Sequence, residues 1–571
     1  MLPCLSAHAR AASLALFLPT DPRPRPAHAV PCFFLPPPPA AKTPGEDPVL
    51  NADWAEHFVA GFQTGPSTAA APAPAAGQQQ RPAYLKASAC CKHFAAYSLE
   101  RYSPTTSRHS FNAVVTEQDL ADTYYPAFVA CANRGNASGV MCSYNAVNGV
   151  PSCASKELLT ENLRDKWGFN GYVTSDCGAV SDVANAHHFA PADKTCAVVL
   201  DAGMDSDCGT LGPDNFFGLH LEKALASGSV SDAAWAGAAR NLLRVQMRLG
   251  MFDPDVVQPF RQLGADAVDT PEHRQLALEA ARQGLVLVKN DDGGSRSAVL
   301  PFSADAVRTI AVVGPHANAT VAMQSNYHGK APIPIVSPAA ALANYAASVK
   351  CVQGCSIAGD DTSGIAAAAA AAAAADVAVL VLGLDSTQEK EGHDRTAISL
   401  PGQQAALLEA VAAAVAATHK QLALVVISGG PVDLSAAKAD PRVSAILVAG
   451  YPGQSGGVAI AETLFGANNP GGKLTQTWYA ADFVNSCSML DMNMRPNATT
   501  GCPGRTYVSA ACLRAHLRPL TDVAICPPRS RAPLCSPVTR SASTRASLSS
   551  NSAKACPSLA SRRVWRQRRT R

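Results

Sequence analysis

WGFNGYVTSDC, residues 167–177, contains the pattern from which the architecture of the first half of the chain follows. An amphipathic turn runs into glycine, a short β-rich run follows, and the carboxylate of Asp176 comes directly after that run. We therefore predict a strand over Tyr172–Ser175 with Asp176 at its C-terminal end. In a (β/α)8 barrel this end of each strand faces the mouth where chemistry takes place, so Asp176 is a candidate catalytic residue.

Strands and helices alternate on both sides of this stretch. We predict further strands over 87–93 and 139–144, and a fourth strand end at 203–205. The predicted helices cover 116–133, 156–167, 192–202 and 217–251. Such alternation implies a parallel sheet with right-handed crossovers. Four strands, against the eight that a closed barrel needs, predict an incomplete (β/α)8-type barrel.

A second parallel α/β unit begins near Thr309. Four apolar runs predict its strands, over 309–315, 377–382, 422–427 and 443–448. Near-continuous Val, Ile and Leu are typical of strands buried on both faces of a sheet. The alanine run 366–375 predicts a crossover helix, because alanine has the highest helix propensity.

Charge divides the chain into an acidic body and a basic tail. Residues 508–571 hold twelve Arg and one Lys against a single acid, so they carry +12, and the whole chain carries +3. The rest of the chain therefore carries −9, which gives no reason to expect nucleic acid or an anionic membrane as a partner. Apart from alanine-dominated sequence, no apolar run of 18 or more residues predicts a membrane span.

The 18 cysteines are scattered, and no spacing among them predicts a zinc site. Scattered cysteines together with the sequons at Asn136, Asn318 and Asn497 fit a secreted protein. The apolar run 11–18 after Arg10 is only a weak imitation of a signal peptide.

EKEGHDR, residues 389–395, is a second acidic cluster, 213 positions after Asp176 at its first residue. Two carboxylates brought together from distant segments are what glycoside hydrolysis needs. A nucleotide-binding alternative, suggested by the strands after Thr309, lacks both G-x-G-x-x-G and G-x-x-x-x-G-K-[ST]. The Arg-rich tail would suit nucleic acid, but it holds a single aromatic residue, Trp565, which gives no interleaved pattern for stacking.

The chain resembles the plant β-D-xylosidases of glycoside hydrolase family 3 from about Thr43 to Tyr507. The motifs that carry the resemblance are TPGEDP (43–48), CKHF (91–94), MCSYN (141–145), SDC (175–177), RLGMF (248–252), QEKE (388–391), GYPGQSGG (450–457) and PGRTY (503–507). The resemblance implies a (β/α)8-type barrel followed by an α/β sandwich. It also implies a retaining hydrolase without a metal or organic cofactor, found outside the cell in the cell wall or apoplast.

The predicted organisation combines this resemblance with the composition. The expected segments are an irregular Pro-rich N-terminus (1–42), a partial barrel domain (43–254), a connector (255–300), an α/β sandwich domain (301–507) and a basic disordered tail (508–571). The implied substrate is a xylo-oligosaccharide or arabinoxylan, from which xylose or arabinose is released at the non-reducing end. The oligomeric state is left open.

The resemblance also implies roles for individual residues. Asp176 would be the nucleophile, and Glu391 the acid/base, with Glu389 as its rival. A retaining glycosidase needs two such groups about 5–5.5 Å apart, and the acid must hold a proton near neutral pH. Because EKEGHDR belongs to the second domain, the active site would form where the two domains meet.

Five further residues are candidates for substrate contact. Lys92 and His93 would hydrogen-bond sugar hydroxyls, Tyr144 and Asn145 would contact the sugar or pack, and Asp205 would contact the substrate or brace the site. We also hypothesise a Cys177–Cys208 disulfide that narrows the pocket where a hexose places its hydroxymethyl group.

An alternative to an active enzyme stays open at this stage. In the family, further ordered sequence with an arginine precedes the Thr43–Pro48 motif, whereas residues 36–42 here do not resemble it. The alternative is a non-catalytic truncated paralogue with at most weak sugar binding.

Overall fold

The computed structural model describes residues 44–64, 84–209, 212, 215–291 and 297–507. Predictions for residues 1–42 and for the tail 508–571 lie outside the described residues. Within the described part, no helix is long and apolar enough to cross a membrane.

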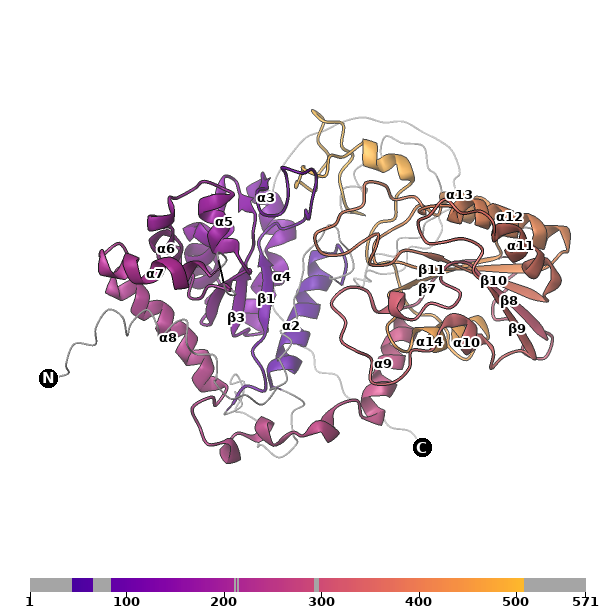
Figure 1. Cartoon of the computed structure of the whole chain (residues 1–571), viewed down its shortest axis with the longest axis horizontal. Helices are drawn as coiled ribbons and strands as arrows, with labels where there is room; N and C mark the ends of the chain where they lie inside the picture. Colours follow the sequence, from indigo (N-terminus) through magenta and orange to yellow (C-terminus); the bar gives the residue numbers. More distant parts are fainter. Residues whose placement is uncertain (1–43, 65–83, 210–211, 213–214, 292–296, 508–571) are drawn as a thin grey trace, which may run out of the picture. The chain divides into compact units, whose positions relative to one another are not determined.

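The first half of the chain is built on a three-stranded parallel sheet (Figure 1). Its strands are β1 (Cys90–Phe94), β3 (Gly139–Cys142) and β6 (Tyr172–Ser175), in the order β1-β3-β6. Cys142 pairs with Phe94 on one side and with Ser175 on the other, so the carboxyl ends of all three strands are level. This arrangement confirms the predicted parallel sheet of an incomplete barrel.

The predicted fourth strand at 203–205 is wrong. Only an isolated bridge joins Ser206 to Thr174. The N–H groups of Asp205 and Ser206 both donate to the carbonyl of Val173, at 2.8 and 3.1 Å, so the two chains do not advance in step. A regular β-ladder needs successive hydrogen bonds to successive partners, so residues 203–206 do not form a strand beside β6.

Helices surround this sheet. Those over 192–201, 216–226 and 232–248 lie where helices were predicted, whereas the helix over 179–185 was not predicted. They are α2 (Pro48–Thr64), α5 (Ala179–Asn185), α6 (Ala192–Asp201), α7 (Phe216–Ala226) and α8 (Asp232–Arg248). The predicted helix 116–133 runs through α3 (Glu117–Asp119), η2 (Leu120–Tyr124), α4 (Pro126–Val129) and η3 (Ala130–Arg134), and the helix 156–167 is η5 (Glu157–Lys166). The side chain of Thr116 caps the first of these helical turns by accepting from Asp119 N at 3.1 Å.

A small second sheet joins β2 (Asn112–Ala113), β4 (Ala146–Val147) and β5 (Val150–Pro151). It joins the segment that follows β1 to the segment that follows β3, because Asn112 pairs with Ala146. Disulfides Cys91–Cys131 and Cys142–Cys153 tie β1 and β3 to the segments that follow them. The core of this half of the chain is continuous.

The second half of the chain is a six-stranded sheet between two layers of helices (Figure 1). The order is β7 (Val286–Asn290), β12 (Ala445–Gly450), β11 (Gln421–Ile427), β10 (Val377–Gly383), β8 (Thr309–Val313) and β9 (Ser348–Val352). All neighbours are parallel except β7 and β12.

Each face of this sheet has its own core. Along β10, Val377, Val379 and Val381 point into one core, whereas Ala378, Leu380 and Leu382 point into the other. Helices α9 (Pro271–Gly284), α10 (Pro338–Leu342) and α14 (Gly456–Leu464) cover the first face. Helices α11 (Ile365–Ala374), α12 (Gln404–Ala417) and α13 (Ser435–Ala439) cover the second. The predicted α/β sandwich is confirmed, and the alanine run forms α11.

Two strands of this sheet were not predicted. β7 lies inside the expected connector 255–300, and its five residues VLVKN are all only partly buried. β9 is an edge strand, SVKCV, with no apolar run. Both lie at an edge of the sheet, where one side of the strand has no neighbour and the demand for apolar residues is weaker.

The end of the described chain returns to the first half. A disulfide joins Cys487 to Cys502, and Met492 and Met494 are buried in the first core. The TPGEDP and PGRTY motifs meet here, because Glu46 accepts hydrogen bonds from Thr477 and from Tyr507 N at 3.1 Å.

Candidate active site

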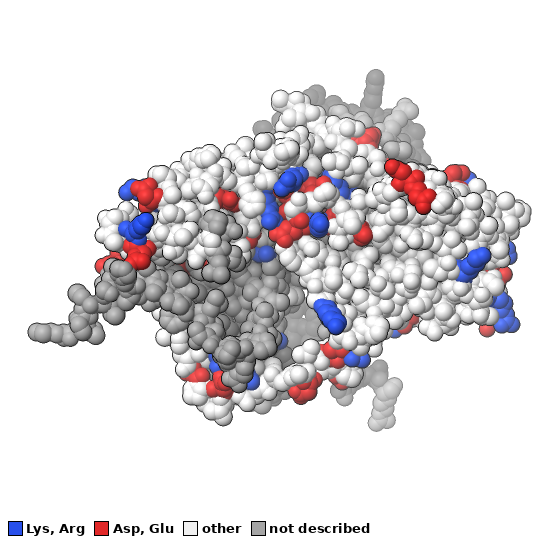
Figure 2. All heavy atoms as spheres, viewed as in Figure 1, with Lys and Arg blue, Asp and Glu red and all other residues white. Residues whose placement is uncertain are grey.

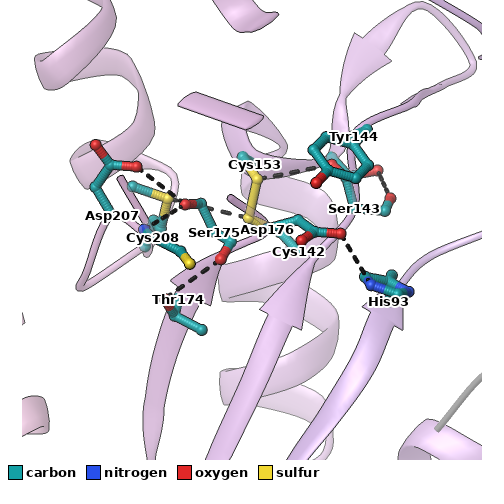
Figure 3. The surroundings of a disulfide bond; sticks show 12 residues. His93, Cys142, Ser143, Tyr144, Cys153, Thr174, Ser175, Asp176, Asp207 and Cys208 are labelled. Carbon is teal, nitrogen blue, oxygen red and sulfur yellow. Dashed lines mark hydrogen bonds and ion pairs between the residues drawn. A yellow bond between two sulfur atoms is a disulfide. The ribbon is translucent and has the colours of Figure 1, made fainter. Parts of the chain in front are cut away.

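The carboxyl ends of the three parallel strands gather most of the predicted site residues. Lys92 and His93 belong to the end of β1, Tyr144 follows β3 and Asp176 follows β6. In parallel sheets such strand ends form the usual place for a ligand. Figure 3 shows Asp176 and His93 pointing toward one another across the strand ends.

Asp176 is held ionised by its neighbours. Its side chain lies 2.9 Å from His93 Nε2, and its other oxygen accepts from Cys177 N at 2.8 Å. Burial opposes ionisation, but His93, Lys92 and the Cys177 N–H outweigh it and lower the pKa of Asp176 to about 2. A buried carboxylate that stays charged is suited to act as a nucleophile.

Tyr144 is buried between the two parts of the chain that carry the candidate carboxylates. Its hydroxyl donates to Cys177 O at 3.1 Å, and the guanidinium of Arg108 lies 4.7 Å from its ring centre. Burial raises the pKa of Tyr144, and the charges of Asp176 and Glu391 raise it further. Both carboxylates are therefore near the same phenol.

Asn145 and Asp205 are engaged in internal contacts. The Asn145 side chain donates to Ala95 O at 3.2 Å and to Ala146 O at 3.0 Å, which fixes the backbone after β1. Asp205 accepts from Val173 N at 2.7 Å and pairs with Arg164 at 2.6 Å. Burial raises the pKa of Asp205 in spite of these partners.

Glu389 anchors the loop that follows β10. It is 4% exposed and accepts from Gly429 N at 2.7 Å and from Tyr451 OH at 2.6 Å. Gly430 N also donates to both of its oxygens at 3.2 Å. A Cβ at Gly430 would lie 2.6 Å from Arg395 Nη2 and 2.9 Å from Glu389 Oε2, so a larger residue here would displace both side chains.

Glu391 lies in a different environment, two residues further on. Its side chain is 32% exposed, and Oε1 lies 2.6 Å from Arg108 Nη1. Arg108 belongs to the first half of the chain, so this ion pair brings Glu391 to the strand ends that carry Asp176. Of the two predicted glutamates, Glu391 is the one that, among the described residues, contacts the arginine packed on Tyr144.

Arg108, Glu100 and Asp394 were not predicted as residues of the site. Arg108 contacts Glu100, Glu391 and Tyr97, and Asp394 accepts from the N–H groups of Glu100 and Arg101. These residues lie in loops without periodicity, and no strand end precedes Glu100 or Arg108. Figure 2 shows charged side chains of both signs clustered near the centre of the visible face.

The hypothesised disulfide forms between Cys177 and Cys208. Ser175 Oγ supports it by accepting from Cys208 N at 2.8 Å and donating to Asp207 at 3.1 Å (Figure 3). The residue after Asp176 is thereby fixed to the segment after β6. No group of three or more His, Cys, Asp or Glu side chains among the described residues could hold a metal ion.

Comparison with known families agrees with this architecture. The model of the glycosyl hydrolase family 3 N terminal domain matches residues 38–245, and that of the glycosyl hydrolase family 3 C-terminal domain matches 285–506. The chain belongs to glycoside hydrolase family 3. The sheet β1-β3-β6 lies in the first match and the six-stranded sheet in the second.

Among individual proteins, the chain is similar to plant and microbial xylosidases. It is 44% identical to "Probable beta-D-xylosidase 7" of Arabidopsis thaliana over 82% of this chain and 58% of that protein. It is 42% identical to "Beta-xylosidase/alpha-L-arabinofuranosidase 2" of Medicago sativa subsp. varia over 82% and 57% of the two chains. A solved GH3 exo-beta-xylosidase, XlnD, in complex with a xylobiose aziridine activity-based probe, superposes with a TM-score of 0.73 at 36% identity, over 82% and 57%. The chain therefore spans a little over half the length of these relatives.

Proposed function

We propose that this protein is a retaining, exo-acting glycoside hydrolase that releases xylose from the non-reducing end of xylan oligosaccharides. The observation that carries the proposal is the pairing of two unlike carboxylates around Tyr144. Asp176 is buried and ionised, and Glu391 is partly exposed and comes from the other half of the chain. The Medicago relative is named for arabinofuranosidase activity as well, so terminal arabinose is a second substrate to test.

The proposed reaction has two steps. In the first, a carboxylate oxygen of Asp176 attacks C1 of the terminal sugar while Glu391 gives its proton to the departing glycosidic oxygen. The products of this step are a glycosyl ester on Asp176 and the shortened sugar. In the second, Glu391 takes a proton from water, the hydroxide attacks C1, and the ester bond to Asp176 breaks. Two inversions at C1 give net retention.

The neighbours of Asp176 have complementary roles in the proposal. His93 Nε2 and Cys177 N orient the carboxylate through both of its oxygens. Lys92, partly exposed at the same strand end, is placed in the proposal as a donor to sugar hydroxyls. Asn145 and Asp205 act on the substrate only indirectly, because their contacts hold the backbone at the ends of β1 and β6.

The Cys177–Cys208 disulfide is proposed to favour a pentose over a hexose. It fills space directly beside the nucleophile, where a hexose would place an additional hydroxymethyl group. Replacing both cysteines by alanine should lower the ratio of kcat/KM for 4-nitrophenyl β-D-xyloside to that for the β-D-glucoside by about 10-fold, since one group in a pocket changes discrimination by about 10–200-fold. An unchanged ratio in a folded variant would remove the disulfide from the account of specificity.

A location outside the cell is part of the proposal. Four disulfides within the described residues fit an oxidising compartment. Of the sequon residues, Asn318 is exposed, while Asn136 and Asn497 are partly buried. Treatment of the protein from its natural source with a deglycosylating amidase should lower its mass, and an unchanged mass would speak against glycosylation at all three.

The function is tested with the purified full chain. Wild-type protein should hydrolyse 4-nitrophenyl β-D-xyloside and react once with a xylose-configured aziridine probe, and the label should map to the peptide that contains Asp176. Asp176→Asn should lower kcat by roughly 10³–10⁶-fold, as expected for loss of a group that acts as part of a catalytic unit. Folded wild-type protein that neither hydrolyses the substrate nor reacts with the probe would support the non-catalytic alternative.

A further inference from the structure

The loop that carries Glu391 is fixed at its base within the second half of the chain. Glu389 and Arg395 flank the base, with Arg395 Nε 3.4 Å from Glu389 and Nη2 donating to Pro431 O at 2.9 Å. Between them, a bridge joins Lys390 to His393. Glu391 therefore lies in a short projecting turn. The contacts at the base of this turn do not by themselves fix the position of the Glu391 carboxylate.

The tip of this turn is attached to the first half of the chain at three points. Gly392 N donates to Glu100 Oε2 at 2.9 Å. Asp394 accepts from Glu100 N at 2.8 Å and from Arg101 N at 2.9 Å. The third point is the ion pair of Glu391 with Arg108. All three tip contacts come from a stretch of four residues.

Glu100 is the centre of this set of contacts. It is 2% exposed, and a single oxygen accepts from Tyr97 OH at 2.8 Å, from Arg108 at 3.2 Å and from Gly392 N. A buried carboxylate is stable only when such partners are in place. Arg108 contacts both Glu100 and Glu391 through the same nitrogen, Nη1. The buried Glu100 therefore fixes the position of Arg108, which in turn pairs with the partly exposed Glu391.

We propose that Glu100, Arg108 and Asp394 are positioning residues that lock the 390–394 turn onto the first half of the chain and so hold Glu391 where it can protonate a departing glycosidic oxygen. This proposal rests on the proposed function for its catalytic consequence, whereas the lock itself does not depend on activity. A shift of about 1 Å in a catalytic group can cost about 10²-fold in rate. A loop delivered from a separate sheet needs such an attachment, because the contacts of Glu389 at its base are with the segments that follow β11 and β12 in its own sheet.

The lock has a structural readout that needs no substrate. In Arg108→Gln and Glu100→Gln, backbone hydrogen exchange of the full chain should become at least about 10-fold faster in peptides that cover residues 386–395 and 98–102. Arg282→Gln is the matched control, since Arg282 forms a two-point pair with Glu462 at 2.7 Å inside the second half of the chain. It should leave exchange in both peptides unchanged.

The positioning role has a kinetic readout that a merely structural contact would not move. Xylobiose has a poor leaving group and depends on the acid, whereas 2,4-dinitrophenyl β-D-xyloside does not. Arg108→Gln should lower kcat/KM for xylobiose by about 10²-fold and change that for the dinitrophenyl substrate by less than about 3-fold. Arg108→Lys, which keeps the charge, should recover part of the loss on xylobiose.

The outcomes separate the two hypotheses. Unchanged exchange in the two peptides of folded Arg108→Gln and Glu100→Gln would overturn the lock, whether or not the protein is active. Faster exchange with equal losses on both substrates would overturn the positioning role and leave only a structural contact. If wild-type protein shows no hydrolysis at all, the proposed function fails, and the positioning role fails with it, but the exchange result still decides the lock.

Discussion

Three carboxylates near the strand ends differ because their surroundings differ. Asp176 is buried beside His93 and is held ionised. Glu389 is also buried, but backbone N–H groups and a tyrosine hydroxyl occupy its oxygens, so it cannot turn to a substrate without breaking them. Glu391 is partly exposed and is held through one oxygen. The surroundings therefore favour Glu391 over Glu389 as the acid/base.

The choice between the two glutamates leads to a direct prediction. Glu391→Gln should lower kcat/KM for xylobiose by roughly 10²–10⁴-fold, the usual contribution of a general acid, and affect the dinitrophenyl xyloside much less. Glu389→Gln should leave the ratio of the two substrates unchanged. It should lower the free energy of unfolding by about 1–3 kcal/mol, because a buried hydrogen-bonded carboxylate is lost. Steady-state kinetics and urea unfolding measure the two effects.

An exchange of the two phenotypes would assign the acid/base to Glu389. Azide offers an independent check, since a small anion replaces the water that the missing base would activate. Azide should accelerate turnover of the dinitrophenyl substrate by the variant that lacks the acid/base and should form a glycosyl azide. The same addition should have no effect on the Asp176→Asn variant, which lacks the nucleophile.

His93 leads to a prediction for the pH dependence. Against the effect of burial, His93 together with Lys92 and the Cys177 N–H lowers the pKa of Asp176 to about 2. The proposed nucleophile is therefore ionised above that pH, and its contribution to stability is lost only as pH falls from about 4 through 2. His93→Phe removes the opposing charge and leaves burial, which raises the pKa. The acid limb of kcat/KM should move up by about one to two pH units.

The measurement is a pH–rate profile of the dinitrophenyl substrate between pH 3 and 7. His220→Phe on α7 serves as the control, because the His220 ring packs on Phe216 and is not among the groups that set the pKa of Asp176. An acid limb that stays in place in folded His93→Phe would show that His93 does not set the ionisation of the nucleophile.

At the scale of elements, the sequence predicted what depends on local pattern. Buried apolar runs identified β8, β10, β11 and β12, and a carboxylate after a β-rich run identified Asp176. The edge strand β9 was not predicted because one side of it has no neighbour to require apolar residues, whereas β7 does carry an apolar run, VLV, and lies within the expected connector. The contacts by which Glu100, Arg108 and Asp394 lock the turn were not predicted for another reason. The residues on the two sides of the lock are almost 300 positions apart in the chain, and only the packing of two separate sheets brings them together.

The 390–394 turn carries a prediction about pH. Burial raises the pKa of Asp394 to about 6, the Glu100 carboxylate raises it too, and the N–H groups of Glu100 and Arg101 oppose the shift. A carboxyl whose pKa is raised in the folded state favours folding below its unfolded pKa, and this contribution is lost as pH rises through the folded value. The window therefore runs from about pH 4 to 6.

Asp394→Asn should remove this dependence. The wild-type free energy of unfolding should fall, relative to the variant, by about 1–3 kcal/mol between pH 4 and 7, since each unit of pKa shift corresponds to about 1.4 kcal/mol. Urea unfolding at both pH values gives the difference, in which the titration of all other groups cancels. A difference of the opposite sign would mean that the two N–H donors outweigh burial and that Asp394 is held ionised.

At the scale of the whole molecule, the described chain is joined across its two sheets by more than the active-site turn. Residues 487–507 follow the second sheet in sequence but bury Met492 and Met494 in the first core. Tyr124 OH donates to Met492 O at 2.7 Å. This segment, closed by the Cys487–Cys502 disulfide, connects the two halves, and we expect it to couple their stability. A family match from sequence assigns it to the second domain and does not show this contact.

Asp119 tests that coupling, and a neighbour provides the control. Asp119 is 1% exposed, accepts from Met494 N at 3.1 Å and pairs with Arg495, whereas the Asp122 side chain pairs with the same arginine but is 55% exposed. Asp119→Ala leaves the buried Met494 N–H without its acceptor, whereas the partly exposed Arg495 keeps Asp122 as a partner, so the variant should lower the free energy of unfolding by about 1–3 kcal/mol. Asp122→Ala removes an exposed ion pair and should cost less than about 1 kcal/mol.

Calorimetry then shows whether the segment couples the two halves. The wild-type chain should unfold in one transition, because the first core includes side chains of a segment that follows the second sheet. In Asp119→Ala the thermal transition should separate into two. The transition with the lower Tm should be the first to disappear when urea is added. Equal effects of the two alanine variants, or a single undisturbed transition in Asp119→Ala, would show that burial of Met492 and Met494 holds the segment in place without the help of the buried carboxylate.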